Sequence, residues 1–195
     1  MSKRSVAKDL FGKPVRQRRP RYEAALEEQD KKTRADRAGR VRWLSDTIPR
    51  SLMFGTSVET ALVFEEATAS FVYGNFVAAV VLAAAFVEHW FVASLIARGY
   101  HKEASQGLAA AIGCARANNL VSPLILDKAD RLRLIRNPFV HLKSFDHQHG
   151  IGQRMAKTRN FDIRALLESD AKEAIIAMHG VAIYAFGRRS HPVEK

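Results

Sequence analysis

The sequence has almost no cysteine. Cys114 is the only one among 195 residues, so no disulfide can form within the chain. A structural zinc site is usually built from several cysteines and histidines, and one cysteine does not supply such a set. We therefore expect no metal and no other cofactor. Disulfides belong to oxidising compartments, and the first residues are charged rather than apolar, so we expect a cytoplasmic protein without a secretory leader.

Several common signatures are also missing. No stretch alternates apolar and polar residues as a strand would, and no repeat of about 20–50 residues is visible. The chain has no glycine-rich loop for cradling phosphates and no nucleophile elbow. These absences argue against P-loop nucleotidases and α/β-hydrolases. Together with the helical patterns described below, they favour an all-α fold.

Acidic residues are too few to balance the lysines and arginines. The net charge is +11, and residues 1–50 contribute +8 of it, with 15 Lys/Arg against 7 Asp/Glu. Such a surplus attracts polyanions, nucleic acid above all. The first 21 residues have little apolar surface to bury, which predicts a basic, largely disordered arm. We expect this arm to bind RNA, with DNA or a merely solubilising role as alternatives, through Arg16, Arg18, Arg19 and Arg21.

Residues 51–190 are predicted to form an up-and-down bundle of four to five helices, and residues 1–50 the arm. The helices are expected over roughly 57–73, 76–97, 102–117, 126–136 and 162–187, with a second candidate cap at Ser169-Asp170 that would split the last one. Capping residues support these limits, because Thr56-Ser57-Val58-Glu59 reads as a capping box with Thr56 as the N-cap and Gly74 ends the first helix. We also expect a charged helix over 22–42, docking of 43–55 on the core, and a polar loop over 143–160.

Only one apolar run is long enough to cross a membrane, from Phe76 to Ile96. Glu88 and His89 lie near its middle, where an ionised side chain would be costly in lipid. Its apolar residues recur at helical spacing, as they do in a core helix. We therefore expect a buried bundle helix and no membrane partner.

The candidate site lies at the end of the predicted fourth helix. Arg136 is followed at once by Asn137 and, after four intervening residues, by His141. Side chains five positions apart diverge by about 140° in a straight helix. Pro138 is expected to break the helix and let Arg136 and His141 face one cleft. Arginine binds phosphate through two donors and histidine transfers protons near neutral pH, so this pair suits the cleavage of RNA.

At these residues the chain resembles the HEPN family, whose motif is an arginine, often followed by asparagine, aspartate or histidine, and then a histidine after four to six intervening residues. The alanine-rich run from Tyr73 to Glu88 resembles that family's helix ending in a buried glutamate. The resemblance covers about residues 57–187. It implies a metal-independent endoribonuclease acting as a homodimer, with His141 as acid or base and Arg136 as phosphate clamp. Asn137 and Glu88 would orient them.

The resemblance also implies a setting in phage defence or a toxin–antitoxin system, with an antitoxin protein as a further partner. One alternative is a catalytically inactive HEPN-like module that binds nucleic acid or nucleotide. Another is a structural or partner-binding bundle in which the helix with Glu88 forms an interface, and Arg136 and Asn137 merely end a helix. His147 and His149 are interpreted as loop residues rather than metal ligands, and His89 as a core or interface histidine.

Overall fold

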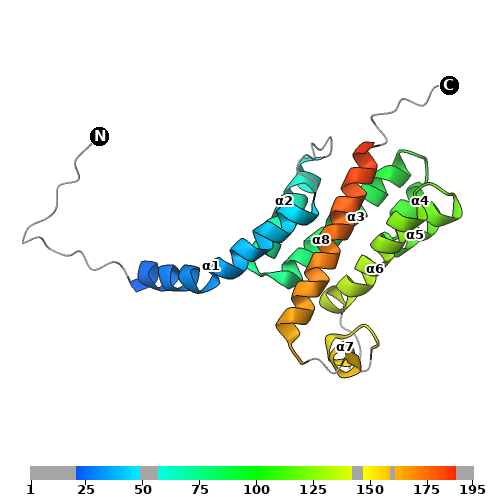
Figure 1. The fold of residues 1–195 in the computed structure, drawn as a ribbon. Coiled ribbons are helices and arrows are strands. Elements are labelled where there is room, and N and C mark those ends of the chain that lie inside the picture. Colours follow the sequence, from blue (N-terminus) through cyan, green and yellow to red (C-terminus); the bar gives the residue numbers. More distant parts are fainter. Residues whose placement is uncertain (1–20, 49–56, 142–146, 159–160, 188–195) are drawn as a thin grey trace, which may run out of the picture. The chain divides into compact units, whose positions relative to one another are not determined.

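The computed structural model describes residues 21–48, 57–141, 147–158 and 161–187 (Figure 1). These residues contain eight helices and no strand, which confirms the all-α prediction but exceeds the four to five helices expected. The chain divides into two compact units, residues 1–38 and 39–195, and α1 runs from one into the other. The helices are α1 (Arg21–Thr47), α2 (Val58–Tyr73), α3 (Phe76–Ile96), α4 (His101–Ala104), α5 (Leu108–Ala117), α6 (Pro123–Val140), α7 (Ile151–Thr158) and α8 (Ile163–Gly187).

The described part of the first unit is the beginning of α1. Its side chains are mostly exposed, and ion pairs such as Lys32 with Glu28, 3.5 Å apart, lie along its surface. The helix predicted over 22–42 is thus present and begins at Arg21. The disorder expected for the arm, and the candidate residues Arg16, Arg18 and Arg19, lie outside the described residues.

The end of α1 belongs to the second unit, where Trp43, Leu44 and Ile48 pack half-buried against the core. This confirms the expected docking as far as residue 48. The Trp43 ring lies 5.1 Å from that of Phe71, centroid to centroid. The remaining residues expected to dock, Leu52, Met53 and Phe54, lie outside the described residues.

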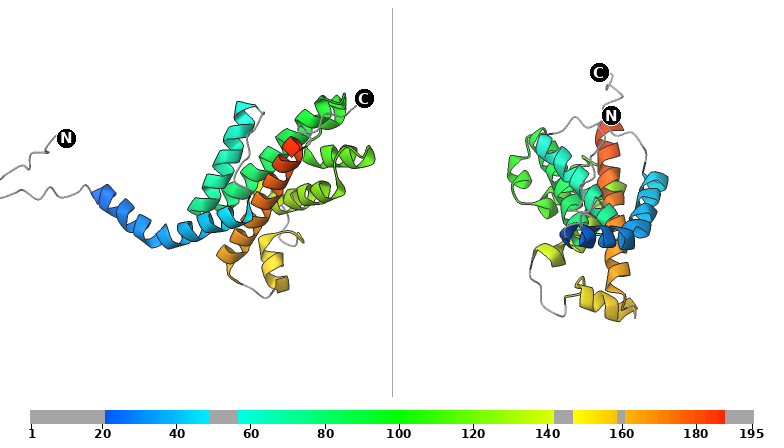
Figure 2. Two further views of the ribbon diagram at one scale, coloured as in Figure 1. Left: turned by 45° about the horizontal axis from the view of Figure 1, so that its top comes forward. Right: turned by 90° about the vertical axis from the view of Figure 1, so that its left-hand side faces the viewer.

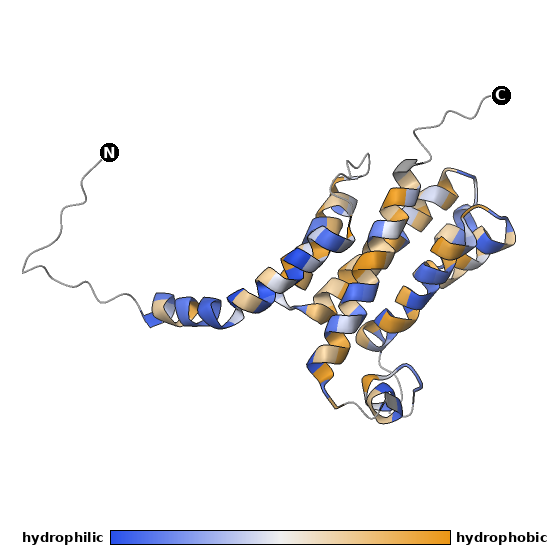
Figure 3. Cartoon of the chain, in the orientation of Figure 1, coloured by the Kyte–Doolittle hydropathy of each residue, from blue (hydrophilic) through white to orange (hydrophobic). Residues whose placement is uncertain are grey.

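The second unit is built around α3. This helix packs against α2, α4, α5, α6 and α8, and the views in Figures 1 and 2 show α2 and α8 beside it. Nine of its residues are buried, including Val80, Val87, Phe91 and Leu95. Among the described helices, only α3 is long and apolar enough to cross a bilayer. Its packing explains that composition, because a central helix needs apolar residues on most faces. In Figure 3 the helices of the second unit carry many hydrophobic residues, whereas the beginning of α1 is largely hydrophilic.

The N-cap of α2 lies one residue later than the capping box predicts, whereas the predicted end at Gly74 is confirmed. Ser57 is its N-cap and accepts a hydrogen bond from the backbone N–H of Thr60 at 3.3 Å. Gly74 ends the helix at φ +80°, a conformation that favours glycine, and its N–H donates to Phe71 O at 3.1 Å. Asn75 is the N-cap residue of α3, but its side chain makes no capping hydrogen bond.

The predicted break at Pro138 is wrong. Helix α6 continues through Pro138 to Val140, and it begins at Pro123 rather than near residue 126. A proline fits the first helical position because the N–H it lacks would have no partner there. Pro138 lies in the last turn, where one missing hydrogen bond costs less than it would at mid-helix. The chain turns extended at His141, with φ −131° and ψ 125°.

Three further expectations needed correction. The helix expected over 102–117 is two helices, α4 and α5, separated by Gly107 at φ +83°. The loop expected over 143–160 contains α7. Helix α8 is continuous through the second cap considered near Asp170, because that carboxylate pairs with Arg154 of α7 instead of capping a helix.

Candidate functional site

The predicted site residues line one pocket of about 510 Å³. Glu88 comes from α3, Arg136 and Asn137 come from α6, and His141 follows α6 directly. The chain separates Glu88 from Arg136 by 48 positions, so the packing of α3 on α6 creates this proximity. The other lining residues are Gln106, Gly107, Leu108, Ala109, Arg133 and Val140.

Arg136 is held by an ion pair inside the pocket. Its Nη2 donates to Glu88 Oε2 at 3.0 Å, and its Nη1 donates to Asn137 Oδ1 at 3.4 Å. The two charged side chains are 19% and 26% exposed, so the pair is half-buried rather than solvated. A guanidinium has five N–H donors. These two contacts fix its orientation and leave donors for an anionic ligand.

His141 is exposed at the edge of the same pocket. Its backbone N–H donates to Asn137 O at 3.0 Å, which closes the last turn of α6. Among the described residues, none forms a hydrogen bond with its imidazole ring. The turn that frees His141 from the helix therefore lies at the end of α6 and not at Pro138. The imidazole is accessible for proton transfer with a ligand in the pocket.

Two cationic features of the pocket were missed. Arg133 lies one helical turn before Arg136, and its Nε donates to Asp130 Oδ1 at 2.8 Å. The spacing of three residues between the two arginines was the signal available in the sequence. The second feature is the start of α5, whose first backbone N–H groups carry partial positive charge. It could not be found because α4 and α5 were predicted as one helix.

The start of α5 approaches Glu88 closely. A Cβ placed on Gly107 would lie 3.6 Å from Glu88 Oε1. The same glycine has φ +83°, which lets the chain turn sharply into α5. The carboxylate thus lies between Arg136 and a helix N-terminus, both of which stabilise its negative charge. Arg133 and Arg136 are each paired with one carboxylate, Asp130 and Glu88, so what they offer an anion is their remaining N–H donors rather than a surplus of charge.

The remaining histidines differ from one another. His147 and His149 have ring centroids 5.6 Å apart, and no group of three metal-binding side chains occurs among the described residues. Burial, followed by the charge of His147, lowers the pKa of His149. His89 is exposed, so its assignment to the core is wrong, and its Nδ1 lies 3.3 Å from Thr60 Oγ1.

The core histidine is His179 of α8, which sequence reasoning did not identify. It is 7% exposed and packs edge-on against Phe64, with ring centroids 4.6 Å apart. Neither ring nitrogen has a hydrogen-bond partner among the described residues. Burial lowers the pKa of His179 to about 4, so the ring is neutral near pH 7.

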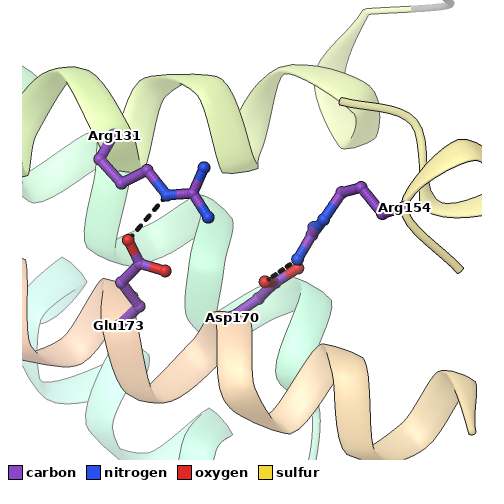
Figure 4. A network of polar contacts seen from close by, with 4 residues as sticks. All are labelled: Arg131, Arg154, Asp170 and Glu173. Atoms are coloured by element: carbon purple, nitrogen blue, oxygen red, sulfur yellow. Dashed lines mark hydrogen bonds and ion pairs between the residues drawn. The ribbon is translucent and has the colours of Figure 1, made fainter. Parts of the chain in front are cut away.

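A separate polar network joins α6, α7 and α8 (Figure 4). Arg154 donates two hydrogen bonds to Asp170, at 2.6 and 2.5 Å, and Asp170 is only 2% exposed. The hydrogen bonds to Asp170 raise the pKa of Arg154 further above its usual value. Arg131 of α6 donates to Glu173 at 2.9 Å. The bidentate pair of Arg154 and Asp170 fixes α7 on α8.

Fold and pocket define an all-helical protein with an arginine, a histidine, an asparagine and a glutamate around one polar pocket. No family model, curated protein or solved structure matches the chain. The proposals below therefore rest on the residues and on the geometry of the pocket.

Proposed function

We propose that the chain is a metal-independent endoribonuclease of HEPN type. The observation that carries this proposal is the meeting of Arg136, Asn137, His141 and Glu88 at one pocket, with His141 exposed there. A purely structural role for the motif would leave His141 buried and internally paired. The pocket instead offers an accessible imidazole beside a fixed guanidinium.

The proposed reaction is an attack of the RNA 2′-hydroxyl on the adjacent phosphate. A base removes the 2′-hydroxyl proton, the oxygen bonds to phosphorus, and the 5′-oxygen leaves with a proton from an acid. The products are a 2′,3′-cyclic phosphate and a 5′-hydroxyl. Imidazole serves as base or acid near neutral pH. Arg136 stabilises the negative charge on the phosphorane, Arg133 adds a second guanidinium, and neither role needs a metal.

We propose that two copies share the reaction as a homodimer. Base and acid are separate groups in this mechanism, and among the described residues His141 is the only histidine that lines the pocket. A second copy supplies a second His141. Glu88 is the positioning residue for Arg136, since its carboxylate holds the guanidinium at 3.0 Å, and Asn137 supports it from the other side.

The alternative is an inactive module that binds nucleic acid or nucleotide in the same pocket. The pairing of Arg136 with Glu88 favours it, because the carboxylate offsets part of the charge that a clamp would bring to a phosphorane. The resemblance also supports a cytoplasmic protein of phage defence or a toxin–antitoxin pair, with an antitoxin as partner. These assignments belong to the proposal.

The decisive experiment incubates the purified chain with labelled RNA in EDTA. We expect cleavage with 2′,3′-cyclic phosphate ends, and loss of cleavage in Arg136→Ala and His141→Ala. His101→Ala is the matched control, because His101 is exposed and does not line the pocket. Cleavage that His141→Ala retains would refute the assignment of His141. RNA binding without cleavage, weakened by Arg136→Ala, would identify the inactive module.

The basic arm is tested separately through salt dependence. Replacing Arg16, Arg18 and Arg19 by glutamine should weaken RNA binding uniformly across sequences. Three lost phosphate contacts should lower the slope of log affinity against log salt by about 2. An unchanged slope would assign the arm to solubility alone.

A further inference from the structure

A second cationic cluster surrounds the turn between α2 and α3 and shares no residue with the Arg136 pocket. Arg40 of α1 and Arg164 of α8 each place their guanidinium carbon 5.3 Å from the ring centroid of Phe76. Both also approach Gly74. A Cβ built there would lie 2.9 Å from Arg164 Nη2 and 3.2 Å from Arg40 Nη2. Two like charges therefore converge on one point of the backbone.

The described carboxylates do not balance this cluster. Glu168 Oε2 lies 4.0 Å from Arg40 Nη1, beyond hydrogen-bond distance, and Glu168 Oε1 lies 3.3 Å from Lys172 Nζ. Arg164 forms no ion pair with any described residue. Among the described residues, Glu168 is therefore shared by Arg40 and Lys172 while Arg164 has no carboxylate partner, so positive charge exceeds negative charge in this cluster. Such an arrangement favours an anion.

Arg40 is the informative member because it is only 4% exposed. Its Nε donates to Val72 O at 3.0 Å, but no described residue accepts a hydrogen bond from its Nη2. A buried cation is normally paired, since water no longer solvates it. The unused donors of Arg40 lie beside Gly74, where the pocket described next begins.

A pocket of about 480 Å³ opens at the same place. Gly74, Asn75 and Arg164 line it together with apolar side chains such as Val77 and Leu167, and Arg40 does not line it but approaches it at Gly74. The first backbone N–H groups of α3 lack acceptors within the helix, and the Asn75 side chain does not cap them. Val77 and Ala78 are exposed, so a ligand can reach this end of the helix. Helix α3 has 21 residues, and the positive end of its dipole adds to the charge of the arginines.

We propose that the α2–α3 turn is a phosphate-binding site formed by Arg40, Arg164 and the first amides of α3. A phosphoryl group fits because its oxygens accept several hydrogen bonds at once, from two guanidiniums and from backbone N–H groups. A larger residue at Gly74 would bring its Cβ against both Nη2 atoms, so glycine leaves the space between them open. The site is independent of the proposed ribonuclease reaction. The phosphoryl group belongs either to free phosphate or to the backbone of a nucleic acid.

The test is a titration of the ¹⁵N-labelled full chain, followed by NMR. One arm replaces chloride by inorganic phosphate at constant ionic strength. The other adds a 2′-O-methyl RNA trinucleotide without a terminal phosphate, which the proposed nuclease reaction cannot cleave. We expect saturable shifts of the Val77 and Ala78 amides. Arg164→Gln should weaken the binding about tenfold, the loss of one charge-assisted contact.

Two further variants keep the result interpretable. Arg98→Gln removes the same charge from an exposed arginine beyond the other end of α3 and should leave the affinity unchanged. Arg40→Lys retains the buried charge but loses the planar fork, and it should weaken binding while circular dichroism reports an intact fold.

Each pattern of shifts has a meaning. Shifts with phosphate alone identify a free phosphate or a phosphate monoester as the ligand. Shifts with the trinucleotide alone, or with both probes, identify a site that also accepts a nucleic-acid backbone. The proposal is overturned if neither probe shifts Val77 and Ala78, or if Arg164→Gln and Arg98→Gln weaken binding equally. Loss of RNA cleavage in Arg136→Ala would bear only on the other pocket.

Discussion

The buried imidazole of His179 should make the protein acid-labile in a defined pH range. Burial lowers its folded pKa from 6.5 to about 4. Between these values the unfolded chain binds a proton that the folded chain excludes, so protonation favours unfolding. The contribution of the neutral His179 ring to the free energy of unfolding is fully present above pH 6.5 and is lost as the pH falls toward 4. A shift of this size corresponds to about 3 kcal/mol in all, and to about 2.5 kcal/mol at pH 4.5.

The perturbation that isolates this contribution is His179→Leu. Leucine fills a similar volume beside Phe64 and brings no ring nitrogens into a site where neither has a partner among the described residues. We expect the variant to be at least as stable at pH 7, because unpaired buried polar atoms cost about 1–3 kcal/mol each. It should then lose less stability than the parent as the pH falls.

The assay is urea unfolding, followed by circular dichroism from pH 7.5 to 4.5. The free energies of unfolding of parent and variant should diverge by about 2.5 kcal/mol over this range, while carboxylate titrations cancel in the difference. Parallel curves for the two proteins would refute the reasoning, since they would mean that His179 gains access to water without unfolding.

Three further pairs of substitutions test the framework and the pocket. Asp170→Asn should lower the free energy of unfolding by about 3 kcal/mol, because it leaves the guanidinium of Arg154 without its buried counter-charge. Glu173→Gln removes one partner of a half-exposed ion pair and should cost less than about 1 kcal/mol in the same urea titration. Gly74→Ala should lower the free energy of unfolding by about 1–2 kcal/mol, because Gly74 has a positive φ. Gly113→Ala in α5, where a Cβ meets open space, should raise the free energy of unfolding by about 0.5–1 kcal/mol. Equal shifts of the melting temperature in the two variants would contradict this. Arg136→Gln and Glu88→Gln should each cost about 1–2 kcal/mol, and the double variant should recover most of that stability but no RNA cleavage. Recovery of cleavage would mean that Arg136 is purely structural.

The long elements of the fold were predictable because local signals specify them. Ser57 and Gly74 mark the two ends of α2 through their own hydrogen bonds. The apolar run of α3 reflects its contact with several neighbouring helices. The errors arose where tertiary contacts decide. The Asp170 carboxylate is suitable for a helix cap, yet it pairs with Arg154 from α7, a helix that was not predicted. Pro138 is tolerated because α6 ends two residues later, at Val140, and the sequence of α6 alone does not specify that end.

Much of the candidate site could be predicted, although for a partly wrong reason. Arg136, Asn137 and His141 are close in sequence, so any turn near the end of α6 brings them to one place. The expected turn was at Pro138, and the actual one is at His141. The role of Glu88 was predicted only from the family resemblance, because no local sequence pattern relates positions 48 residues apart. Arg133 and the start of α5 were missed because their contribution depends on the same packing.

The ion pair between Arg136 and Glu88 is compatible with a phosphate clamp. Nη2 is bound to Glu88 and Nη1 faces Asn137, so one side of the planar guanidinium is fixed while other N–H groups remain for an oxyanion. A lysine would have a single nitrogen for both tasks and could not keep the carboxylate contact while binding phosphate bidentately. Because the ion pair already orients the guanidinium, Arg136 would lose less side-chain entropy on binding RNA. The carboxylate also offsets part of the positive charge of Arg136. Arg133, whose Nε is bound to Asp130, and the amides of α5 provide further N–H donors at the pocket, at whose edge His141 is exposed.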